Sequence, residues 1–230
     1  MRSSYLLALA FVLPIISCAA DHSLDTLEKK ASYSIGVDFI NRMQAQNAEI
    51  DVDAFIRGIS DASSGKETAM TQPEMTQTIK DFQQHVTELR QAKQKELASK
   101  NIEAGKAFLA TNASNEGVIT TESGLQYKII KEGTGDSPKL EDTVVTNYEG
   151  RLIDGQVFDS SYKRKQPATF PVKGVIKGWT EALQLMKTGA KWQLFVPADI
   201  AYGASQRGKL IQANSTLIFD IELLEIKAAK

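Results

Sequence analysis

The stretch 71–112 limits the fold of this chain more than any other part of the sequence, because it contains no helix breaker between Pro73 and Gly105. Thr71 and Glu74 have the spacing of a capping box, and Pro73 falls in the first turn, where its missing N–H is not needed. The pattern predicts one helix of ~40 residues, which would be ~60 Å long. We therefore expect a long helix that connects separate parts of the chain.

The apolar stripe of this long helix covers only its first half. Apolar residues follow one another at spacings of four and three, and charged residues then succeed them on the same face. The apolar members are Met75, Ile79, Phe82, Val86 and Leu89, and the charged ones are Lys93, Glu96 and Lys100. We expect the first half to pack against other apolar surface and the second half to be a solvated stalk. The alternative is a bend that folds the second half back.

Two shorter helices are predicted before the long one, within residues 21–70. The first carries apolar residues at helical spacing on one face: Leu24, Leu27, Ala31, Ile35, Phe39 and Met43. The second ends near Gly65 and carries Phe55, Ile56, Ile59 and Ala62. Two short helices and half of a long one make a thin core for an independent domain. Pairing with a second copy would bury these stripes, so we expect residues 21–70 to form a homodimer.

Residues 1–20 have the pattern of a secretory signal, in which Arg2 precedes a short apolar run and small residues follow. No apolar run reaches the roughly 18 residues that span a bilayer. Cys18 is the only cysteine, and it allows two interpretations. The sequence around it resembles a bacterial lipobox, so that Cys18 would carry a lipid anchor; alternatively, cleavage after Ala20 removes it. Either way we expect export to the periplasm or outer membrane, with or without exposure at the cell surface, and no internal disulfide.

Residues 118–227 differ in composition from the helical part and hold most of the glycines and prolines and both tryptophans. Alternating apolar residues predict antiparallel strands, most regularly at 217–223, and Asp154-Gly155 predicts a hairpin turn. The segment 179–186 is the one helical pattern. We therefore expect an α+β fold, in which a twisted antiparallel sheet wraps around a short helix and the gap between them is the ligand site.

Several kinds of chemistry lack the residues they need. The only histidines are His22 and His85, so the C-terminal region has no Ser-His-Asp site and lacks ligands for zinc. Gly133 and Gly135 are not followed by the lysine and helix start of a phosphate-binding loop. A net charge of -1 argues against a general nucleic-acid binder, which normally has a basic face. We expect neither a metal nor a cofactor.

Five short blocks resemble the FK506-binding (FKBP-type) peptidyl-prolyl cis-trans isomerases, in the order and at the spacing of that family. The blocks are 147–150 (NYEG), 154–161 (DGQVFDSS), 175–179 (VIKGW), 201–203 (AYG) and 214–219 (NSTLIF). Residues 32–36 (SYSIG) and the long helix further resemble the macrophage infectivity potentiator (Mip) subgroup, in which the N-terminal arm dimerises. The resemblance implies an FKBP-like isomerase domain over residues 118–227, preceded by an all-α dimerisation arm.

The resemblance also implies roles for individual residues. The catalytic residues would be Asp159, Tyr202, Phe158 and Trp179, and the substrate pocket would add Tyr148, Arg164, Val175, Ile176 and Phe219. Trp179 would form the floor under the proline ring, and Asp159, paired with Arg164, would lie beside the twisted amide. The Tyr202 hydroxyl and the Ile176 backbone N–H would donate to substrate carbonyls. The implied partners are unfolded or proline-containing polypeptides and FK506-like macrolides.

Two positions depart from the family pattern. The family usually has a proline before the asparagine that matches Asn214, so Gln212-Ala213 should make that loop more flexible. Ala168 stands where some relatives carry an aromatic residue, which should open one pocket wall.

Other interpretations of the same residues remain. Without the resemblance, the aromatic residues would be assigned to the core and Asp159 to a turn or a cap. An alternative function is a dimeric periplasmic or surface chaperone, or a host-interaction module, with incidental isomerase activity. Two apolar pockets in one dimer would bind unfolded chains through avidity.

Overall fold

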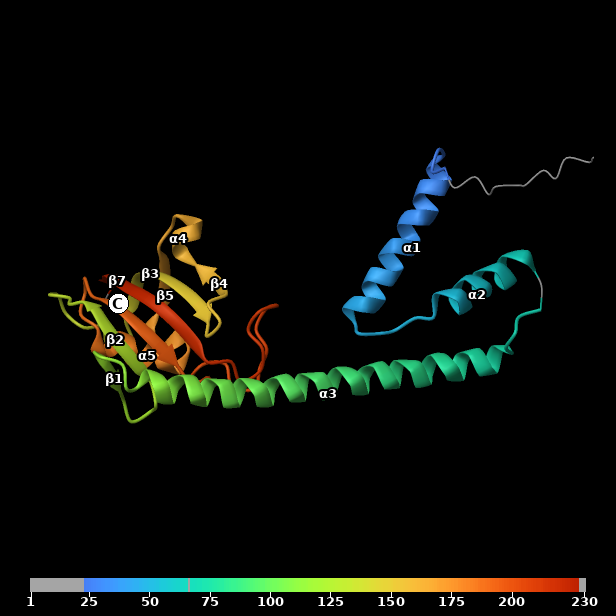
Figure 1. Ribbon diagram of the computed structural model, residues 1–230. Coiled ribbons are helices and arrows are strands. Elements are labelled where there is room, and N and C mark those ends of the chain that lie inside the picture. The colour runs from blue at the N-terminus through green and yellow to red at the C-terminus, as the bar shows by residue number, and fades with distance from the viewer. Residues whose placement is uncertain (1–22, 66, 228–230) are drawn as a thin grey trace, which may run out of the picture. The chain divides into compact units, whose positions relative to one another are not determined.

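The computed structural model describes residues 23–65 and 67–227, so the predicted signal and Cys18 lie outside the described residues. The chain divides into two compact units, one up to Met75 and the other from Thr76. Figure 1 labels the helices and strands of both. No helix in the described ranges is both long enough and apolar enough to cross a membrane.

Two helices lie in the first unit: α1 (Leu27–Ala45) and α2 (Val52–Ser64). Each begins at a capping side chain, Thr26 for α1 and Asp51 for α2, which accepts a hydrogen bond from a backbone N–H of the first turn. At the end of α2, Gly65 adopts a left-handed backbone with a φ of 66°, a conformation that commonly terminates helices. The two short helices predicted from the sequence are confirmed.

The first unit has almost no interior of its own. Among the described residues, α1 and α2 contribute no buried side chain. The two helices touch through Phe39 and Phe55, whose rings stack with centroids 4.7 Å apart. The large apolar side chains that stay exposed on them include Leu27, Tyr33, Ile35, Val37, Val52, Ile56 and Ile59. So much apolar surface in water is unusual for a monomeric protein.

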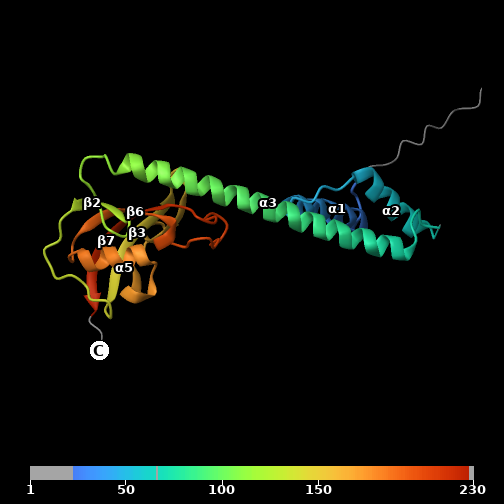
Figure 2. The same cartoon turned by 90° about the horizontal axis from the view of Figure 1, so that it is seen from below.

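The long helix α3 (Gln72–Asn112) runs without interruption for 41 residues. At its start, the Glu74 carboxylate accepts a hydrogen bond of 2.8 Å from the Thr71 N–H, and the Thr71 hydroxyl accepts one of 3.4 Å from the Glu74 N–H. The predicted capping box is therefore present. The alternative of a mid-helix bend is wrong, because the helix continues straight through that region (Figure 2).

The last part of α3, from Asn101 onward, packs against the C-terminal region, and this corrects the prediction of a solvated second half for that part of the helix. The charged residues that precede it are exposed as predicted, namely Lys93, Glu96 and Lys100. Gly105 and Asn112 are buried, and the ring centroid of Phe108 lies 5.9 Å from that of Phe195. The Asn112 amide donates a buried hydrogen bond of 2.8 Å to Gln126. The stalk prediction is wrong for residues 101–112 because their packed face consists of small, polar and aromatic residues, which do not form an aliphatic stripe.

Within residues 76–227, seven strands form one antiparallel sheet. The strand order is β1-β2-β6-β7-β3-β4, and β5 also pairs with β3. The strands are β1 (Val118–Thr120), β2 (Gln126–Lys131), β3 (Thr143–Leu152), β4 (Val157–Ser160), β5 (Ala168–Pro171), β6 (Lys191–Val196) and β7 (Leu217–Lys227). The connections hold α4 (Ser161–Arg164), η1 (Val172–Gly174), α5 (Lys177–Leu185) and η2 (Ala198–Ile200).

The hydrophobic core lies between α5 and one face of the sheet (Figures 1 and 2). Every second residue of β3 is buried from Val144 to Gly150, as expected where side chains alternate between the two faces of a strand. Trp179, Ala182 and Leu183 bring the buried side of α5 into the same core. The predicted α+β fold, a twisted antiparallel sheet around a short helix, is confirmed.

The hairpin between β3 and β4 turns at Asp154-Gly155, as predicted. Gly155 has a φ of 89°, which glycine adopts readily because it has no Cβ. The Leu152 N–H donates to the Gln156 carbonyl over 2.9 Å and closes the turn. The hairpin matters for the site because it brings β4 back alongside β3.

Candidate active site

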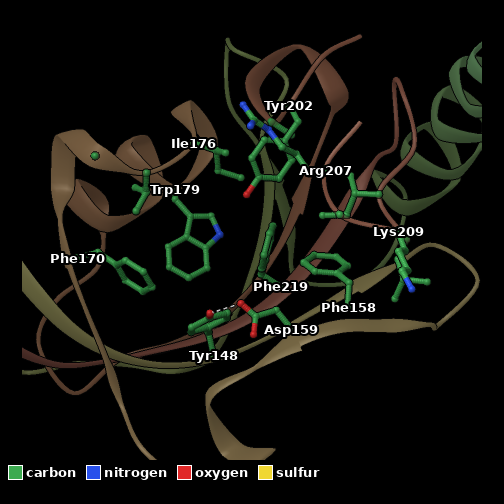
Figure 3. A pocket seen from close by; sticks show the side chains of 16 residues that line it. Tyr148, Phe158, Asp159, Phe170, Ile176, Trp179, Tyr202, Arg207, Lys209 and Phe219 are labelled. Carbon is green, nitrogen blue, oxygen red and sulfur yellow. Dashed lines mark hydrogen bonds between the residues drawn. The ribbon is translucent and has the colours of Figure 1, made fainter. Parts of the chain in front are cut away.

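A pocket of about 1010 Å³ opens between the sheet, the start of α5 and the loop that follows η2 (Figure 3). We call this loop, residues 201–216, the pocket loop. Eight of the residues predicted for the site lie together in the lining: Tyr148, Phe158, Asp159, Val175, Ile176, Trp179, Tyr202 and Phe219. Arg164 does not line the pocket, but it contacts two residues that do. Cys18, the predicted lipidation residue, lies outside the described residues.

Trp179 is the centre of the aromatic walls. It lies in the first turn of α5, and only 4% of its surface is exposed. Tyr148, Phe170 and Phe219 meet its indole edge-on, with ring centroids 5.3, 5.8 and 5.1 Å away. Such edge-to-face contacts favour one orientation of the rings. Strands β3, β5 and β7 therefore hold the indole in place as one wall of the pocket (Figure 3).

Gly150 provides the room that two further aromatic rings occupy. It pairs with Asp159 across the β3–β4 ladder. A Cβ at this position would lie 2.6 Å from the Phe158 ring and 2.8 Å from the Phe219 ring. These two rings pack edge-on, with centroids 5.6 Å apart. A larger residue at position 150 would push one ring toward the pocket.

Asp159 is the acidic group of the pocket, and two neighbours hold it. The Tyr148 hydroxyl donates to one of its carboxylate oxygens, and Arg164 forms an ion pair with the other. Arg164 also donates a hydrogen bond of 3.0 Å to the Tyr148 hydroxyl, which closes a three-membered network. This network fixes the orientation of the carboxylate at the pocket edge.

The network also keeps Asp159 charged. Partial burial alone would raise the pKa of Asp159, but the hydrogen bond from Tyr148 and the ion pair with Arg164 outweigh burial and lower it below the ordinary value of 3.8. Burial raises the pKa of Tyr148, and its hydrogen bond to Asp159 raises it further. At neutral pH the pocket therefore presents a carboxylate, and Tyr148 is a neutral donor.

One hydroxyl donor and one backbone N–H donor lie on the side of the cavity opposite Asp159 (Figure 3). Tyr202 is the second residue of the pocket loop, and the Arg207 guanidinium lies over its ring, 5.5 Å from the centroid. Ile176 is the N-cap of α5, and its carbonyl accepts from the N–H groups of Trp179 and Thr180. The Ile176 N–H makes no backbone hydrogen bond in the described part of the chain. Figure 3 shows the Tyr202 hydroxyl directed toward the middle of the cavity.

Sequence reasoning missed part of the lining. Phe170 on β5 contributes a wall, whereas Ala168, which was expected to open one, is not among the lining residues. The signal was available, since the two positions lie two residues apart in one strand and so share a face. The tip of the pocket loop, residues 207–211, was also missed. Exposed loop residues such as Lys209 follow no periodicity that would place them at a cavity.

The arrangement suits recognition of a small apolar ring next to a polar amide. The walls are aromatic and aliphatic, while a carboxylate, a hydroxyl and a backbone N–H provide a few fixed polar contacts, which is the usual make-up of a small-ligand pocket. In residues 23–65 and 67–227, no cluster of three or more His, Cys, Asp or Glu side chains is placed to hold a metal ion.

Comparison with known families gives two matches that follow one another along the chain. Residues 28–129 match the family described as the domain amino terminal to FKBP-type peptidyl-prolyl isomerase. Residues 135–224 match the family described as FKBP-type peptidyl-prolyl cis-trans isomerase. Together they cover most of the described residues.

Similar proteins and structures agree with these matches. The peptidyl-prolyl cis-trans isomerase Mip of Coxiella burnetii is 48% identical over 204 residues, which cover 89% of each chain. The outer membrane protein MIP of Legionella longbeachae is 46% identical over 207 residues, 90% of this chain and 89% of that one. The crystal structure of FkpA from Escherichia coli superposes with a TM-score of 0.76 at 38% identity, covering 90% of this chain and 100% of that one.

Proposed function

Because the chain belongs to the family of FKBP-type peptidyl-prolyl cis-trans isomerases and accelerates rotation about X–Pro bonds, we propose that it does so in the pocket around Trp179. The main support for the proposal is that an aromatic cavity has the Tyr148–Asp159–Arg164 network at its edge. The alternative of a binding module with incidental isomerase activity is not favoured by the family assignment.

Rotation about an X–Pro bond is slow because the amide loses its resonance on the way, at a cost of ~18–20 kcal/mol. No covalent bond to the protein and no proton transfer are needed. A catalyst has to bind the twisted amide more tightly than either planar form. The twisted amide is less polar than the planar ones, so an apolar pocket that excludes water favours it.

The aromatic walls supply that environment. We assign to Trp179 the floor under the proline ring, because its indole is rigidly held by Tyr148, Phe170 and Phe219. Phe158 packs against Phe219 and closes the side next to Asp159. Val175 and Ile176 complete the apolar surface before α5. A proline ring enclosed in this way would leave its amide bond facing the polar groups.

Asp159 acts electrostatically in this proposal. When the amide twists, the nitrogen lone pair no longer delocalises into the carbonyl, and the carbonyl carbon becomes more electron-poor. A carboxylate held beside that carbon stabilises the twisted form more than the planar ones. Tyr148 and Arg164 keep Asp159 ionised and oriented for this role.

Tyr202 and Ile176 position the peptide. The Tyr202 hydroxyl would donate to a substrate carbonyl, and the Ile176 backbone N–H, which makes no backbone hydrogen bond in the described part of the chain, would bind another. Each donor orients the chain on one side of the proline. The pocket volume of about 1010 Å³ is also large enough for FK506-like macrolides.

The test is the isomerisation of a Phe-Pro or Leu-Pro peptide with and without FK506, using the wild type, Asp159→Ala and the control Glu116→Ala. Glu116 is exposed and lies outside the pocket lining. We expect fast, FK506-sensitive exchange in the wild type and the control, and a large loss in Asp159→Ala. An Asp159→Ala protein as fast as the wild type, with both well above the spontaneous rate, which takes tens of seconds or more, would contradict the proposed site.

We propose that the functional form is a homodimer joined through residues 21–70. The support is the exposed apolar surface of α1 and α2, on which Leu27 and Ile35 are 77% and 67% exposed. A second copy would bury the same surface twice and supply the interior that this unit lacks.

We further propose that the chain is exported to the cell envelope and anchored by lipid at Cys18. Support comes from the secretory pattern of residues 1–20 and from a relative that is named an outer membrane protein. Mass spectrometry of the mature N-terminus tests the anchor. A lipid-modified Cys18 would support it, and a free N-terminus at Asp21 would contradict it.

A further inference from the structure

The pocket loop is closed by backbone hydrogen bonds at two levels. Near its ends, the Asn214 N–H donates to the Gly203 carbonyl over 2.7 Å. Nearer its tip, Arg207 and Ile211 exchange backbone hydrogen bonds of 2.8 and 3.3 Å. Because residues 207–211 line the pocket, the position of the tip depends on how the base around Gly203 and Asn214 is held.

The base of the loop is held by α3, a helix that contributes nothing to the pocket lining. The Asn101 amide donates a hydrogen bond of 2.8 Å to the backbone carbonyl of Ala213. Asn101 is half-buried at this contact. One turn further along α3, Gly105 is buried against Thr216, where a side chain would collide with the threonine hydroxyl. The helix therefore fits directly onto the C-terminal end of the loop.

The helix and the loop are less closely fitted before Asn101. In that direction Gln94 and Ala98 on the helix, with Gln206 and Gln212 on the loop, border a groove of about 420 Å³. Ala213, which accepts the hydrogen bond from Asn101, borders this groove, whereas Asn101 itself does not. A change at Asn101 would therefore extend the groove toward the base of the loop.

The sequence of the loop gives this hydrogen bond its importance. A proline near Ala213 would restrict the backbone there by fixing one dihedral angle. Gln212 and Ala213 lack that restriction, and within the loop the Gln212 carbonyl accepts a hydrogen bond from the Ser215 hydroxyl. An amide donor on a rigid helix restricts the same segment in another way, because it fixes the direction of the Ala213 carbonyl. Asn214, the next residue, already has a left-handed backbone with a φ of 60°.

We propose that Asn101 is a positioning residue of the isomerase, which holds the Ala213 carbonyl and so sets the pocket loop in its substrate-binding position. The inference rests on the proposed function of the pocket. Through this contact, the long helix that precedes the sheet domain controls how well the pocket binds its substrate. Tyr202 and the tip residues 207–211 are the groups whose placement depends on it.

Loss of the hydrogen bond should appear mainly in KM. A loop that has become mobile must be ordered when the substrate binds, and this cost is shared by the ground state and the transition state. A neutral hydrogen bond of ordinary strength corresponds to a fall in kcat/KM of about two- to tenfold. We expect kcat to change by less than about twofold.

The experiment uses the full chain with Asn101→Ala, Asn101→Asp and the control Ser99→Ala. Aspartate keeps the shape of asparagine but cannot donate from the lost amide. Ser99 is exposed on α3, two residues away, and lies outside the groove lining. Three quantities are measured for each protein: kcat and KM on a Leu-Pro peptide, the thermal midpoint, and hydrogen exchange at the amides of Arg207, Ile211 and Asn214.

We expect both Asn101 variants to raise KM and to speed exchange at the three loop amides, while the thermal midpoint and the exchange of β3 and β7 amides stay close to wild type. Faster loop exchange with unchanged kinetics would overturn the proposal, as would unchanged loop exchange. Faster exchange spread evenly over the sheet would mean a general structural role and would also contradict it. The exchange measurement needs no activity, so it separates this inference from the assignment of the pocket, which Asp159→Ala tests.

Discussion

The hydroxyl of Tyr148 on β3 donates a hydrogen bond to the carboxylate of Asp159 on β4. Asp159 pairs with Gly150, two residues along β3 from Tyr148, so the two side chains are diagonal neighbours on one face of the sheet. Gly150 has no side chain between them, and the β3–β4 turn sets the register that makes them meet. The hairpin therefore brings Tyr148 and Asp159 together at the polar edge of the pocket, and Arg164 joins them from α4, which follows β4.

Replacing Arg164 with methionine should shift the acid limb of the activity profile. In the wild type the pKa of Asp159 is below its ordinary value of 3.8, so activity should be level through neutral pH and fall only in strong acid. Without the ion pair, partial burial raises the pKa of Asp159 and the fall begins at higher pH. The measurement is kcat/KM against pH, with Lys163→Met as the control on the same short helix α4. Superimposable profiles would contradict the role of Arg164.

The same pair should make stability depend on pH in a defined direction. A carboxyl whose pKa is lowered in the folded state adds stability above the pKa of the unfolded chain and loses it as pH falls through the folded value. The difference in unfolding free energy between wild type and Arg164→Met should therefore be largest at pH 7. It should shrink toward zero once the pH falls below 3.8, the ordinary pKa of an aspartate. Urea unfolding at pH 7 and pH 3 measures it. A difference that grows in acid would have the wrong sign.

The two tryptophans offer a matched pair for separating the pocket from the core. Trp179 is 4% exposed and meets three pocket rings, whereas Trp192 is 5% exposed and stacks on Tyr127 with centroids 4.3 Å apart. Each change to phenylalanine should lower the unfolding free energy by about 0.5–3 kcal/mol. Only Trp179→Phe should also weaken FK506 binding and lower kcat/KM, as measured by titration and peptide isomerisation. Equal loss of binding in both variants would mean that the change acts through the core and would contradict a specific role of Trp179 in the pocket.

Gly150→Ala should disturb the pocket by displacing one of the two aromatic rings that pack on Gly150. The new Cβ would lie 2.6 Å from the Phe158 ring and 2.8 Å from the Phe219 ring, and overpacking of this kind costs about 1–3 kcal/mol. We expect a lower unfolding midpoint and a lower kcat/KM, since one ring has to move toward the substrate. Gly58→Ala is the control, because that helical glycine has open space around it and alanine there should stabilise by about 0.5–1 kcal/mol. Full activity in Gly150→Ala would show that both rings can relax without harm to the site.

Local signals were sufficient to predict the elements that frame the site. The Thr71–Glu74 spacing located the start of α3, and Asp154-Gly155 located the hairpin turn, because both depend on residues close together in the chain. Such local signals could not predict which residues meet in the pocket, because those residues are far apart in the chain. Taken one at a time, Tyr148, Trp179 and Phe219 would be assigned to the core by the sequence pattern. The family resemblance predicted that they share a pocket, and the structure places all three in its lining.

What the sequence did not reveal depends on contacts between distant residues. The face of α3 that carries Asn101, Gly105 and Asn112 is polar and small, so hydrophobic periodicity assigned it to solvent. Its fit to the sheet domain becomes visible only with the partner positions Ala213 and Gln126 in place. Hydrogen bonds across more than 100 residues leave no local pattern, and the contact from Asn101 spans 112.

Ile56→Lys combined with Ile59→Lys should convert the proposed dimer into a monomer. Both residues are more than half exposed on α2, at 58% and 54%, and two charges on this apolar face would be buried without partners in a dimer. Sedimentation at micromolar concentration measures the mass, and the control Ala54→Lys with Ser64→Lys adds the same charge at two exposed positions on another side of α2. Activity on a short peptide should persist in the monomer, because the pocket lies entirely in the second unit. A wild type that already sediments as a monomer would refute the dimer, and a double variant that remains dimeric would place the interface elsewhere.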